Sequence, residues 1–182
     1  MDNKETRIVI AGFGGQGIVL TGSVLAQACV IEGKNVTGMV SYGAEMRGGT
    51  ANSTVVISDE EIASPVVEKP GCGIILNQPS LDKFEGRIVE GGLVILNSSL
   101  VDGQVQRSDL EVVNIAATEM ADRLGNIRVA NIVALGAFVK KSGILKMSSV
   151  EQALEHIFTG RKANLIEINK RALAAGAAGV TE

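Results

Sequence analysis

The chain has 182 residues, a length typical of one domain, and 17 basic against 20 acidic residues leave a net charge of −3. Only 3% of the residues are aromatic, so we expect neither the basic stripe nor the stacking platforms of nucleic-acid-binding proteins. No apolar stretch approaches the roughly 18 residues of a membrane span, and the charged segment 1–7 runs straight into a strand pattern, so we expect a cytoplasmic protein with residues 1–182 as a single domain.

The first half of the chain predicts three strands and one long helix. Bulky residues over 7–11 and 35–40 are typical of strands, and a third strand is expected over 52–57. Residues 15–32 are apolar nearly all round, which predicts a helix that is buried on several sides and ends at Gly33.

The second half predicts further strands and then a run of helices. Continuous apolar runs over 72–76 and 93–96 are typical of buried parallel strands, and another strand is expected over 111–115. Ser148 is a fair N-cap for a helix over 148–158, with Glu151 completing a capping box. Further helices are expected over 80–84, after residue 115 through 121, over 129–141 and over 163–175. The alternation predicts an α/β fold with a Rossmann-like, doubly wound, mostly parallel sheet, helices on both faces and a helical C-terminal part.

The sequence G-F-G-G-Q-G at 12–17 matches the dinucleotide fingerprint and lies between the first strand and the first helix. Free amides at such a helix start attract an anion. A dinucleotide site also needs an acid about 20 residues further on, at the end of the second strand, yet no acid lies between Glu32 and Glu45. The pattern therefore speaks against NAD(P) and leaves a structural turn or an anion cradle, whose candidate residues are Gly14, Gly15, Gln16 and Gly17.

The sequence S-Y-G-A-E-M-R-G-G-T-A-N at 41–52 is the second candidate segment. We expect it and the glycine turn to be carboxyl-end loops of adjacent strands that face one crevice, as ligand-binding loops of open α/β sheets do. The Arg47 guanidinium suits a carboxylate or phosphate, and Glu45 would orient it. An internal Glu–Arg pair that only folds the loop is the alternative. Tyr42, Gly48 and Gly49 complete the set of binding candidates, and no residue is assigned a catalytic role.

Metal chemistry on this chain is not expected. Cys29 and Cys72 are two thiols where an iron–sulfur cluster takes four, and His156 is the single histidine. Each cysteine is interpreted as a small buried hydrophobe, and His156 as a solvated residue on a helix.

Four segments together resemble the gamma subunit of 2-oxoacid:ferredoxin oxidoreductases. They are G-F-G-G-Q-G-I-V-L-T-G from Gly12, S-Y-G-A-E-M-R-G-G-T-A-N-S-T-V-V-I-S-D-E-E-I from Ser41, S-P-V-V from Ser64 and A-N-I-V-A-L-G-A-F from Ala130. The Arg-Gly-Gly-Thr form is more similar to 2-oxoglutarate or general 2-oxoacid enzymes than to the pyruvate type. Ala44 stands where proline is common in the family, which implies a less rigid loop.

The resemblance implies a subunit that is inactive alone. Its complex would oxidise a 2-oxoacid, 2-oxoglutarate above all, to an acyl-CoA, with ferredoxin or flavodoxin as electron acceptor. Thiamine diphosphate, magnesium and iron–sulfur clusters would lie on the alpha, beta and delta partner subunits, because this chain lacks the G-D-G and paired asparagines of thiamine enzymes. The chain itself would wall the active site and receive coenzyme A. A stand-alone nucleotide-binding module and a purely structural assembly subunit are the alternatives, and a homodimer of the isolated chain stays open.

Overall fold

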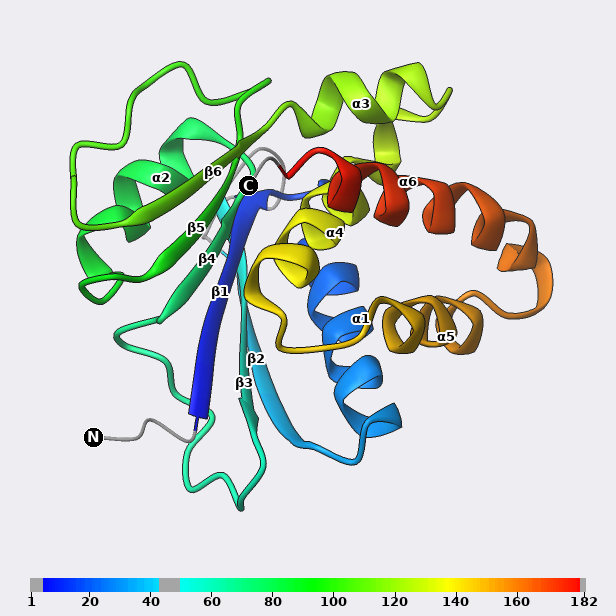
Figure 1. Cartoon of the computed structure of the whole chain (residues 1–182), viewed down its shortest axis with the longest axis horizontal. Helices are drawn as coiled ribbons and strands as arrows, with labels where there is room; N and C mark the ends of the chain where they lie inside the picture. The colour runs from blue at the N-terminus through cyan, green and yellow to red at the C-terminus, as the bar shows by residue number, and fades with distance from the viewer. Residues whose placement is uncertain (1–4, 43–49, 181–182) are drawn as a thin grey trace.

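The fold is described by a computed structural model over residues 5–42 and 50–180. A six-stranded sheet with strand order β2-β3-β1-β4-β5-β6 forms its centre (Figure 1). The strands are β1 (Glu5–Phe13), β2 (Asn35–Tyr42), β3 (Thr50–Ser58), β4 (Cys72–Ile75), β5 (Leu93–Asn97) and β6 (Glu111–Ile115). Strands β1, β4, β5 and β6 pair in parallel, whereas β3 is antiparallel to both β1 and β2. Among these described strands only β3 runs in the opposite direction, which confirms the mostly parallel sheet.

The central strands are apolar on both faces because helices cover both. Along β1, Ile8 and Ile10 belong to one core and Val9 and Ala11 to the other, as the alternation of side chains along a strand requires. The short strands β4 and β5 are buried almost throughout, which explains why they read as continuous apolar runs rather than as alternating ones.

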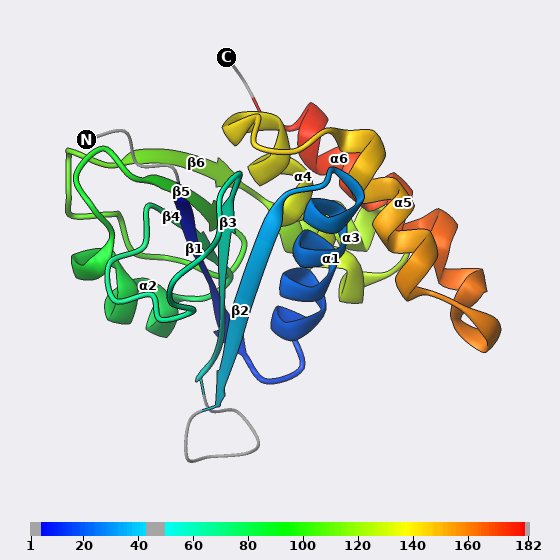
Figure 2. The ribbon, with the colours of Figure 1, turned by 90° about the horizontal axis from the view of Figure 1, so that it is seen from below.

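The helices are unequally divided between the two faces (Figure 2). They are α1 (Ile18–Ile31), α2 (Gln78–Phe84), α3 (Ala117–Arg123), α4 (Ala130–Ser142), α5 (Met147–Ile157) and α6 (Ile166–Ala178), with short 3-10 turns at Glu85–Arg87, Ile127–Val129 and Gly160–Leu165. Helix α2 and the chain around Val101 and Leu110 close the smaller core, whereas α1, α3, α4, α5 and α6 contribute to the larger one. Helices on both faces and a helical C-terminal part are thereby confirmed.

Helices α4 and α6 cross at van der Waals contact of their backbones. A Cβ added to Gly136 would lie 2.0 Å from the carbonyl oxygen of Leu173, and one added to Gly176 would lie 1.8 Å from that of Val133. Real Cβ atoms do not approach other atoms this closely, so only glycine fits at either position. The crossing fixes α6 against the helix that carries one wall of the site described below.

Several expected helix starts are wrong; α6, for example, begins at Ile166 rather than at residue 163, because residues 160–165 form a 3-10 turn. The first helix begins at Ile18 rather than at residue 15, because Gly15 and Gly17 adopt φ values of +98° and +75°, which a right-handed helix cannot contain. Helix α5 begins at Met147 with Lys146 as its N-cap, and no side chain caps it, so the box of Ser148 and Glu151 does not form.

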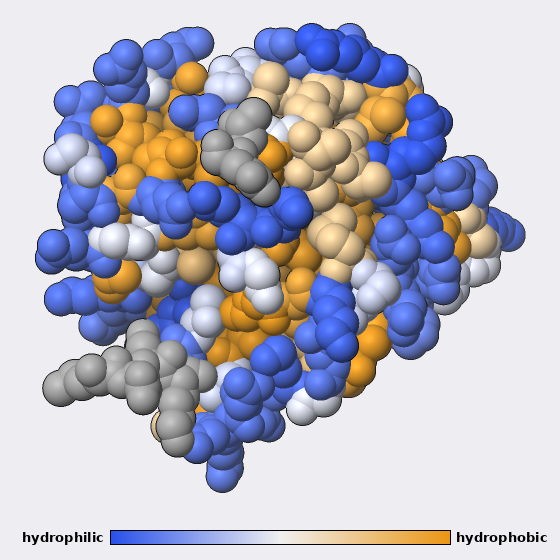
Figure 3. Space-filling view, viewed as in Figure 1, coloured by the Kyte–Doolittle hydropathy of each residue, from blue (hydrophilic) through white to orange (hydrophobic). Residues whose placement is uncertain are grey.

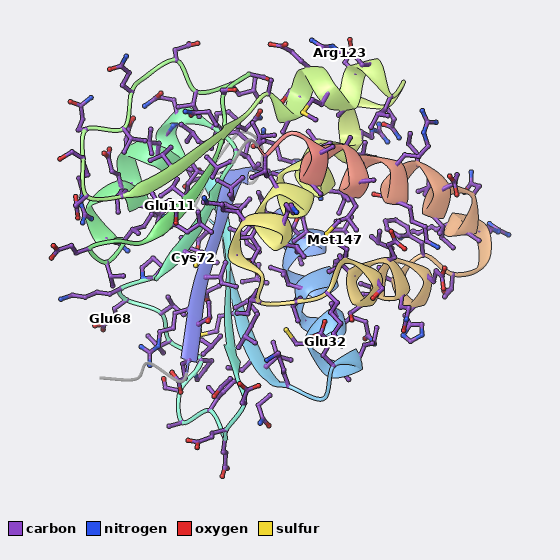
Figure 4. The ribbon with its side chains drawn as sticks, in the orientation of Figure 1. Glu32, Glu68, Cys72, Glu111, Arg123 and Met147 are labelled. Atoms are coloured by element: carbon purple, nitrogen blue, oxygen red, sulfur yellow. The ribbon has the colours of Figure 1, made fainter. Side chains whose placement is uncertain are left out.

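A tertiary contact positions the start of α5 instead. The Lys146 amide donates a hydrogen bond of 2.6 Å to Glu32 Oε1 at the end of α1. Figure 4 labels Glu32 and, at the first residue of α5, Met147. The contact joins residues far apart in the sequence, so local pattern rules could not predict where the helix begins.

The surface of the face in view is divided by hydropathy. Hydrophilic side chains dominate the end formed by α5 and α6, and hydrophobic groups show through near the sheet and α2 (Figure 3). None of the described helices has both the length and the apolar character needed to cross a bilayer.

Candidate functional site

A pocket of about 280 Å³ lies at the carboxyl ends of the parallel strands. The turn after β1, the ends of β4 and β5, and the starts of α3 and α4 surround it, which is where open α/β sheets bind ligands. Its lining residues are Gly15, Gln16, Leu76, Asn97, Leu100, Thr118, Ile127, Arg128, Ala130 and Asn131.

The Gln16 side chain folds the glycine turn. Its Oε1 accepts hydrogen bonds from the Phe13 amide at 2.6 Å and from Asn77 Nδ2 at 3.3 Å, while its own amide donates to the Phe13 carbonyl at 3.1 Å. Gly12 is tightly packed, because a Cβ there would lie 2.5 Å from Gln16 Oε1, 2.8 Å from Ile18 Cδ1 and 3.2 Å from Leu76 Cβ. The Gln16 amide that we expected in an anion cradle is therefore already used within the turn.

Gly14 differs from its neighbours because no described atom lies within 4 Å of the position that a Cβ would occupy, and its φ is not positive. Neither packing among the described residues nor backbone conformation therefore demands glycine here. A glycine costs roughly 0.5–1 kcal/mol in conformational entropy relative to alanine in regular structure. This open backbone, next to Gly15 on the pocket wall, leaves room for close approach by another molecule.

The first turn of α1 is held by a helix more than a hundred residues away in sequence. The Gly17 carbonyl accepts from the Thr21 amide at 2.9 Å, from Thr21 Oγ1 at 3.0 Å and from Asn131 Nδ2 at 3.1 Å. Asn131 Nδ2 also lies 3.0 Å from Thr21 Oγ1. This network ties α4 to the helix start that opens on the pocket.

The side chain of Asn131 has a hydrogen-bond acceptor, its Oδ1, that no described residue uses. The residue is 2% exposed, and its Oδ1 has no hydrogen-bond partner within the described part of the chain. Buried polar atoms are rarely left unpaired, so this oxygen needs an explanation such as a water molecule or a ligand donor. Asn131 is thus an acceptor on the pocket wall.

The same wall is favourable to negative charge. Helix α1 has no side-chain N-cap and no acidic residue in its first turn, so its N-terminal amides and helix dipole are uncompensated by the chain. Arg128, which is exposed, supplies a cation from the turn before α4. The pocket therefore suits a ligand that carries both an anionic group and a hydrogen-bond donor.

Asn97 and Thr118 form a rigid part of the pocket wall. Asn97 Nδ2 donates to Thr118 Oγ1 at 2.9 Å and to the Leu76 carbonyl at 3.4 Å, and the Thr118 amide donates back to Asn97 Oδ1 at 3.3 Å. These contacts join the ends of β4 and β5 to the start of α3.

The structure brings only part of the expected site together. Gly15, Gln16 and Gly17 lie at or beside the pocket, whereas Glu45, Arg47, Gly48 and Gly49 lie outside the described residues. Tyr42 ends β2, and its side chain is likewise outside the description.

The two candidate loops do not follow adjacent strands. The ends of β1 and β2 reach the same sheet edge, because Phe13 pairs with Thr50 and Tyr42 with Ala51. Strand β3 nevertheless lies between β1 and β2, so the expectation of adjacency is wrong. An antiparallel hairpin partner had not been recognised in the strand pattern of 52–57.

Asn97, Thr118, Arg128 and Asn131 were missed as site residues. A signal was present for Asn131, which is one polar residue in the apolar stretch A-N-I-V-A-L-G-A-F. Asn97 likewise ends an apolar strand run. Their convergence on one pocket follows from the sheet order, which the sequence pattern alone leaves undetermined.

The thiols and the histidine take no part in the pocket. Burial raises the pKa of Cys29 to about 12 and that of Cys72 to about 11, so both stay protonated at neutral pH. His156 is exposed on α5, as expected, with Nδ1 3.2 Å from Gln27 Nε2. Within residues 5–42 and 50–180, no three His, Cys, Asp or Glu side chains gather as metal ligands would.

Comparison with known proteins identifies a matching family. A family model described as pyruvate ferredoxin/flavodoxin oxidoreductase matches residues 7–179. Ketoisovalerate oxidoreductase subunit VorA of Methanothermobacter marburgensis is 40% identical over 176 residues, which are 96% of this chain and 36% of that protein. The 2-oxoglutarate synthase subunit KorC of Methanocaldococcus jannaschii is 40% identical over 154 residues, covering 83% of this chain and 81% of that one. The chain thus spans about a third of the VorA relative but most of the KorC relative.

Solved structures share the fold. The gamma subunit of a keto/oxoacid ferredoxin oxidoreductase from Geobacter sulfurreducens PCA superposes with a TM-score of 0.83 at 30% identity, covering 96% of this chain and 97% of that one. A 2-oxoglutarate:ferredoxin oxidoreductase from Magnetococcus marinus, solved with 2-oxoglutarate, coenzyme A and succinyl-CoA, gives a TM-score of 0.88 at 23% identity. It covers 99% of this chain and 32% of that one. The second likeness shows the fold alone.

Proposed function

Because the chain belongs to the pyruvate ferredoxin/flavodoxin oxidoreductase family, we propose that it is the gamma-type subunit of a complex that oxidatively decarboxylates a 2-oxoacid. The products are an acyl-CoA, carbon dioxide and reduced ferredoxin or flavodoxin. The chain is inactive alone and acts by shaping the crevice through which the acyl acceptor arrives. The pocket at the carboxyl ends of the strands is the observation that carries this role.

The proposed oxoacid is 2-oxoglutarate. The KorC relatives of Methanocaldococcus jannaschii and Methanothermobacter marburgensis are matched over 81% and 85% of their length, whereas the VorA relative is matched over 36%. The Arg-Gly-Gly-Thr sequence supports the 2-oxoglutarate type. Ketoisovalerate is the second candidate because VorA is equally identical. The ratio of kcat/KM for the two oxoacids in the assembled complex decides between them.

We assign thiamine diphosphate, magnesium and the iron–sulfur clusters to the alpha, beta and delta subunits. Two protonated thiols, of which Cys29 is buried and Cys72 is partly buried, do not fit a cluster that takes four thiolates. Coenzyme A is the group that the pocket suits. Its phosphates would lie near Arg128 and the start of α1, and its N–H groups would offer a donor to Asn131 Oδ1.

The pocket volume indicates how much of coenzyme A this chain would hold. The volume of about 280 Å³ lies just below that of typical ligand sites, which span roughly 300–1,000 Å³. One part of the molecule would fit here, and partner subunits would cover the rest. The role is therefore shared recognition rather than complete binding by the isolated chain.

Gly14→Ala tests the proposal, because the added methyl group meets no described atom of the chain. We expect an unchanged or slightly higher melting temperature. In the reconstituted complex the KM for coenzyme A should rise about tenfold, which corresponds to about 1.4 kcal/mol. Gly14→Leu should raise it further. Gly86→Ala is the matched control, since Gly86 is equally open and lies beside α2 on the other face of the sheet.

The outcomes separate the alternatives. Wild-type kinetics in both Gly14 variants, with assembly verified by gel filtration, would mean that no ligand approaches this turn. Lower stability without a change in KM would assign Gly14 to packing within the chain. Failure of the complex to assemble would favour the alternative that this chain is a purely structural assembly subunit.

A further inference from the structure

The two edges of the sheet differ in how they are protected against pairing with another strand. At one edge, β6 carries Glu111, whose carboxylate lies 2.6 Å from Lys141 Nζ of α4 (Figure 4). At the other edge, β2 has no charged residue along its eight positions, N-V-T-G-M-V-S-Y. Exposed edge strands usually carry a charge, a proline or a bulge that blocks association. Strand β2 carries neither charge nor proline.

Strand β2 also exposes one large apolar side chain on each face. Met39 is 49% exposed and Val40 is 43% exposed. Pairing with β3 shows that Val36, Gly38 and Val40 share the face of α1, because their partners Val55 and Ile57 belong to the core beneath that helix. Thr37, Met39 and Ser41 lie on the opposite face.

A groove of about 220 Å³ continues this surface between β2 and α1. The helix presents Gly22, Ser23 and Ala26 to it, and Val30 on the same helix is 59% exposed. Helix α1 lies next to β2 (Figure 2), and its small residues line the groove beside the strand. An added strand would therefore find backbone hydrogen-bonding groups and an adjoining apolar groove.

We propose that β2 pairs antiparallel with β2 of a second copy of this chain, around a two-fold axis through Gly38. In this register Val36 faces Val40 of the second copy, and Thr37 faces Met39 of the second copy, each pair on one face of the joint sheet. Asn35 faces Ser41 of the second copy. No charged residues oppose each other, so the edge is compatible with itself.

The absence of charge on β2 favours pairing with a second copy of this chain over pairing with a strand of a different protein. Complementary charges commonly select a specific heterologous partner, and β2 offers none, whereas a two-fold dimer needs only a surface compatible with its own copy. Contact limited to one strand of about 26 Å and one helix flank falls among small interfaces, below about 1,200 Å² in total. The dimer should therefore be weak and concentration-dependent.

Sedimentation equilibrium of the isolated chain over a concentration series tests the proposal. Val40→Lys should weaken self-association at least tenfold. Val89→Lys is the matched control, because Val89 is 40% exposed but lies away from β2. Equal melting temperatures exclude misfolding as the cause. Equal self-association of the two variants would overturn the proposal, as would a wild-type chain that stays monomeric at millimolar concentration.

Cysteine cross-linking tests the register. Thr37→Cys and Met39→Cys should form a disulfide-linked dimer after the two variants are mixed and oxidised, and neither variant should do so efficiently alone. Cross-linking of Met39→Cys with itself would overturn the register around Gly38. If Val40→Lys blocks assembly of the complex while the wild-type chain remains monomeric, the edge belongs to a different subunit and the second copy is refuted.

Discussion

Replacing Gly176 with alanine tests how closely α4 and α6 must approach. The new Cβ would lie 1.8 Å from the Val133 carbonyl oxygen, 2.7 Å from its carbon and 3.1 Å from the Ala137 amide nitrogen. All three atoms are backbone, so no side-chain rotation relieves the clash. The helices would have to separate by roughly 1.5 Å to restore ordinary van der Waals contact.

Two opposing effects set the magnitude. Overpacking of a tight core costs about 1–3 kcal/mol, and more where backbone must move, while alanine in a helix gains about 1 kcal/mol over glycine. Because only backbone movement relieves this clash, we take the upper end of that cost, about 3 kcal/mol, which leaves a net loss of about 2 kcal/mol. For a domain of this size that corresponds to a melting temperature lower by roughly 4–8 °C.

Thermal and urea unfolding of Gly176→Ala and Gly86→Ala provide the measurement. Gly86 has open space around its Cβ position, so its variant should be neutral or slightly stabilised. A Gly176→Ala protein that melts with the wild type would refute the crossing geometry. Gly136→Ala, whose Cβ would lie 2.0 Å from the Leu173 carbonyl oxygen, should behave like Gly176→Ala.

Four further predictions address the thiols, the glycine turn and the arginine loop. Cys29 and Cys72 should resist a thiol reagent at pH 8 in the native state and react in urea, because burial raises their pKa to about 12 and about 11. The pKa values of both thiols are higher in the folded than in the unfolded protein. Their contribution to the free energy of unfolding should therefore be fully present below about pH 8.5 and should be lost as the pH rises towards 11–12. Calorimetry should detect no specific NAD(H) or NADP(H) binding, because the ribose-binding acid is missing; micromolar affinity would contradict this. Arg47→Ala should leave the fold intact and weaken coenzyme A or oxoacid affinity in the complex roughly tenfold to a hundredfold; unchanged Michaelis constants would limit the loop to packing.

The strands were predictable where the local pattern is strong. The apolar runs at 72–76 and 93–96 correspond to β4 and β5. Both faces of these strands are buried, so their residues are continuously apolar and the runs are easily recognised as buried strands. The antiparallel insertion of β3 was not predictable from its residues. Strand order depends on which edges pair in three dimensions, and the sequence of 50–58 would suit either direction.

The pocket shows the same division between local and tertiary information. The glycine turn was recognisable because its backbone geometry needs glycine at Gly15 and Gly17. Asn131 and Arg128 join it only because α4 packs beside α1, at contacts that span more than a hundred residues. The spacing of residues in the sequence does not indicate that these two helices pack together.

The three hydrogen bonds to the Gly17 carbonyl have a consequence for local unfolding. Helix ends usually fray, but this carbonyl is bound by Thr21 and by Asn131 from another helix. The amide of Thr21 should therefore exchange its hydrogen only in large openings, whereas the amides of Gly14 and Gly15 exchange quickly. The first turn of α1 is thus already ordered before a ligand enters the pocket, so binding there loses little conformational entropy.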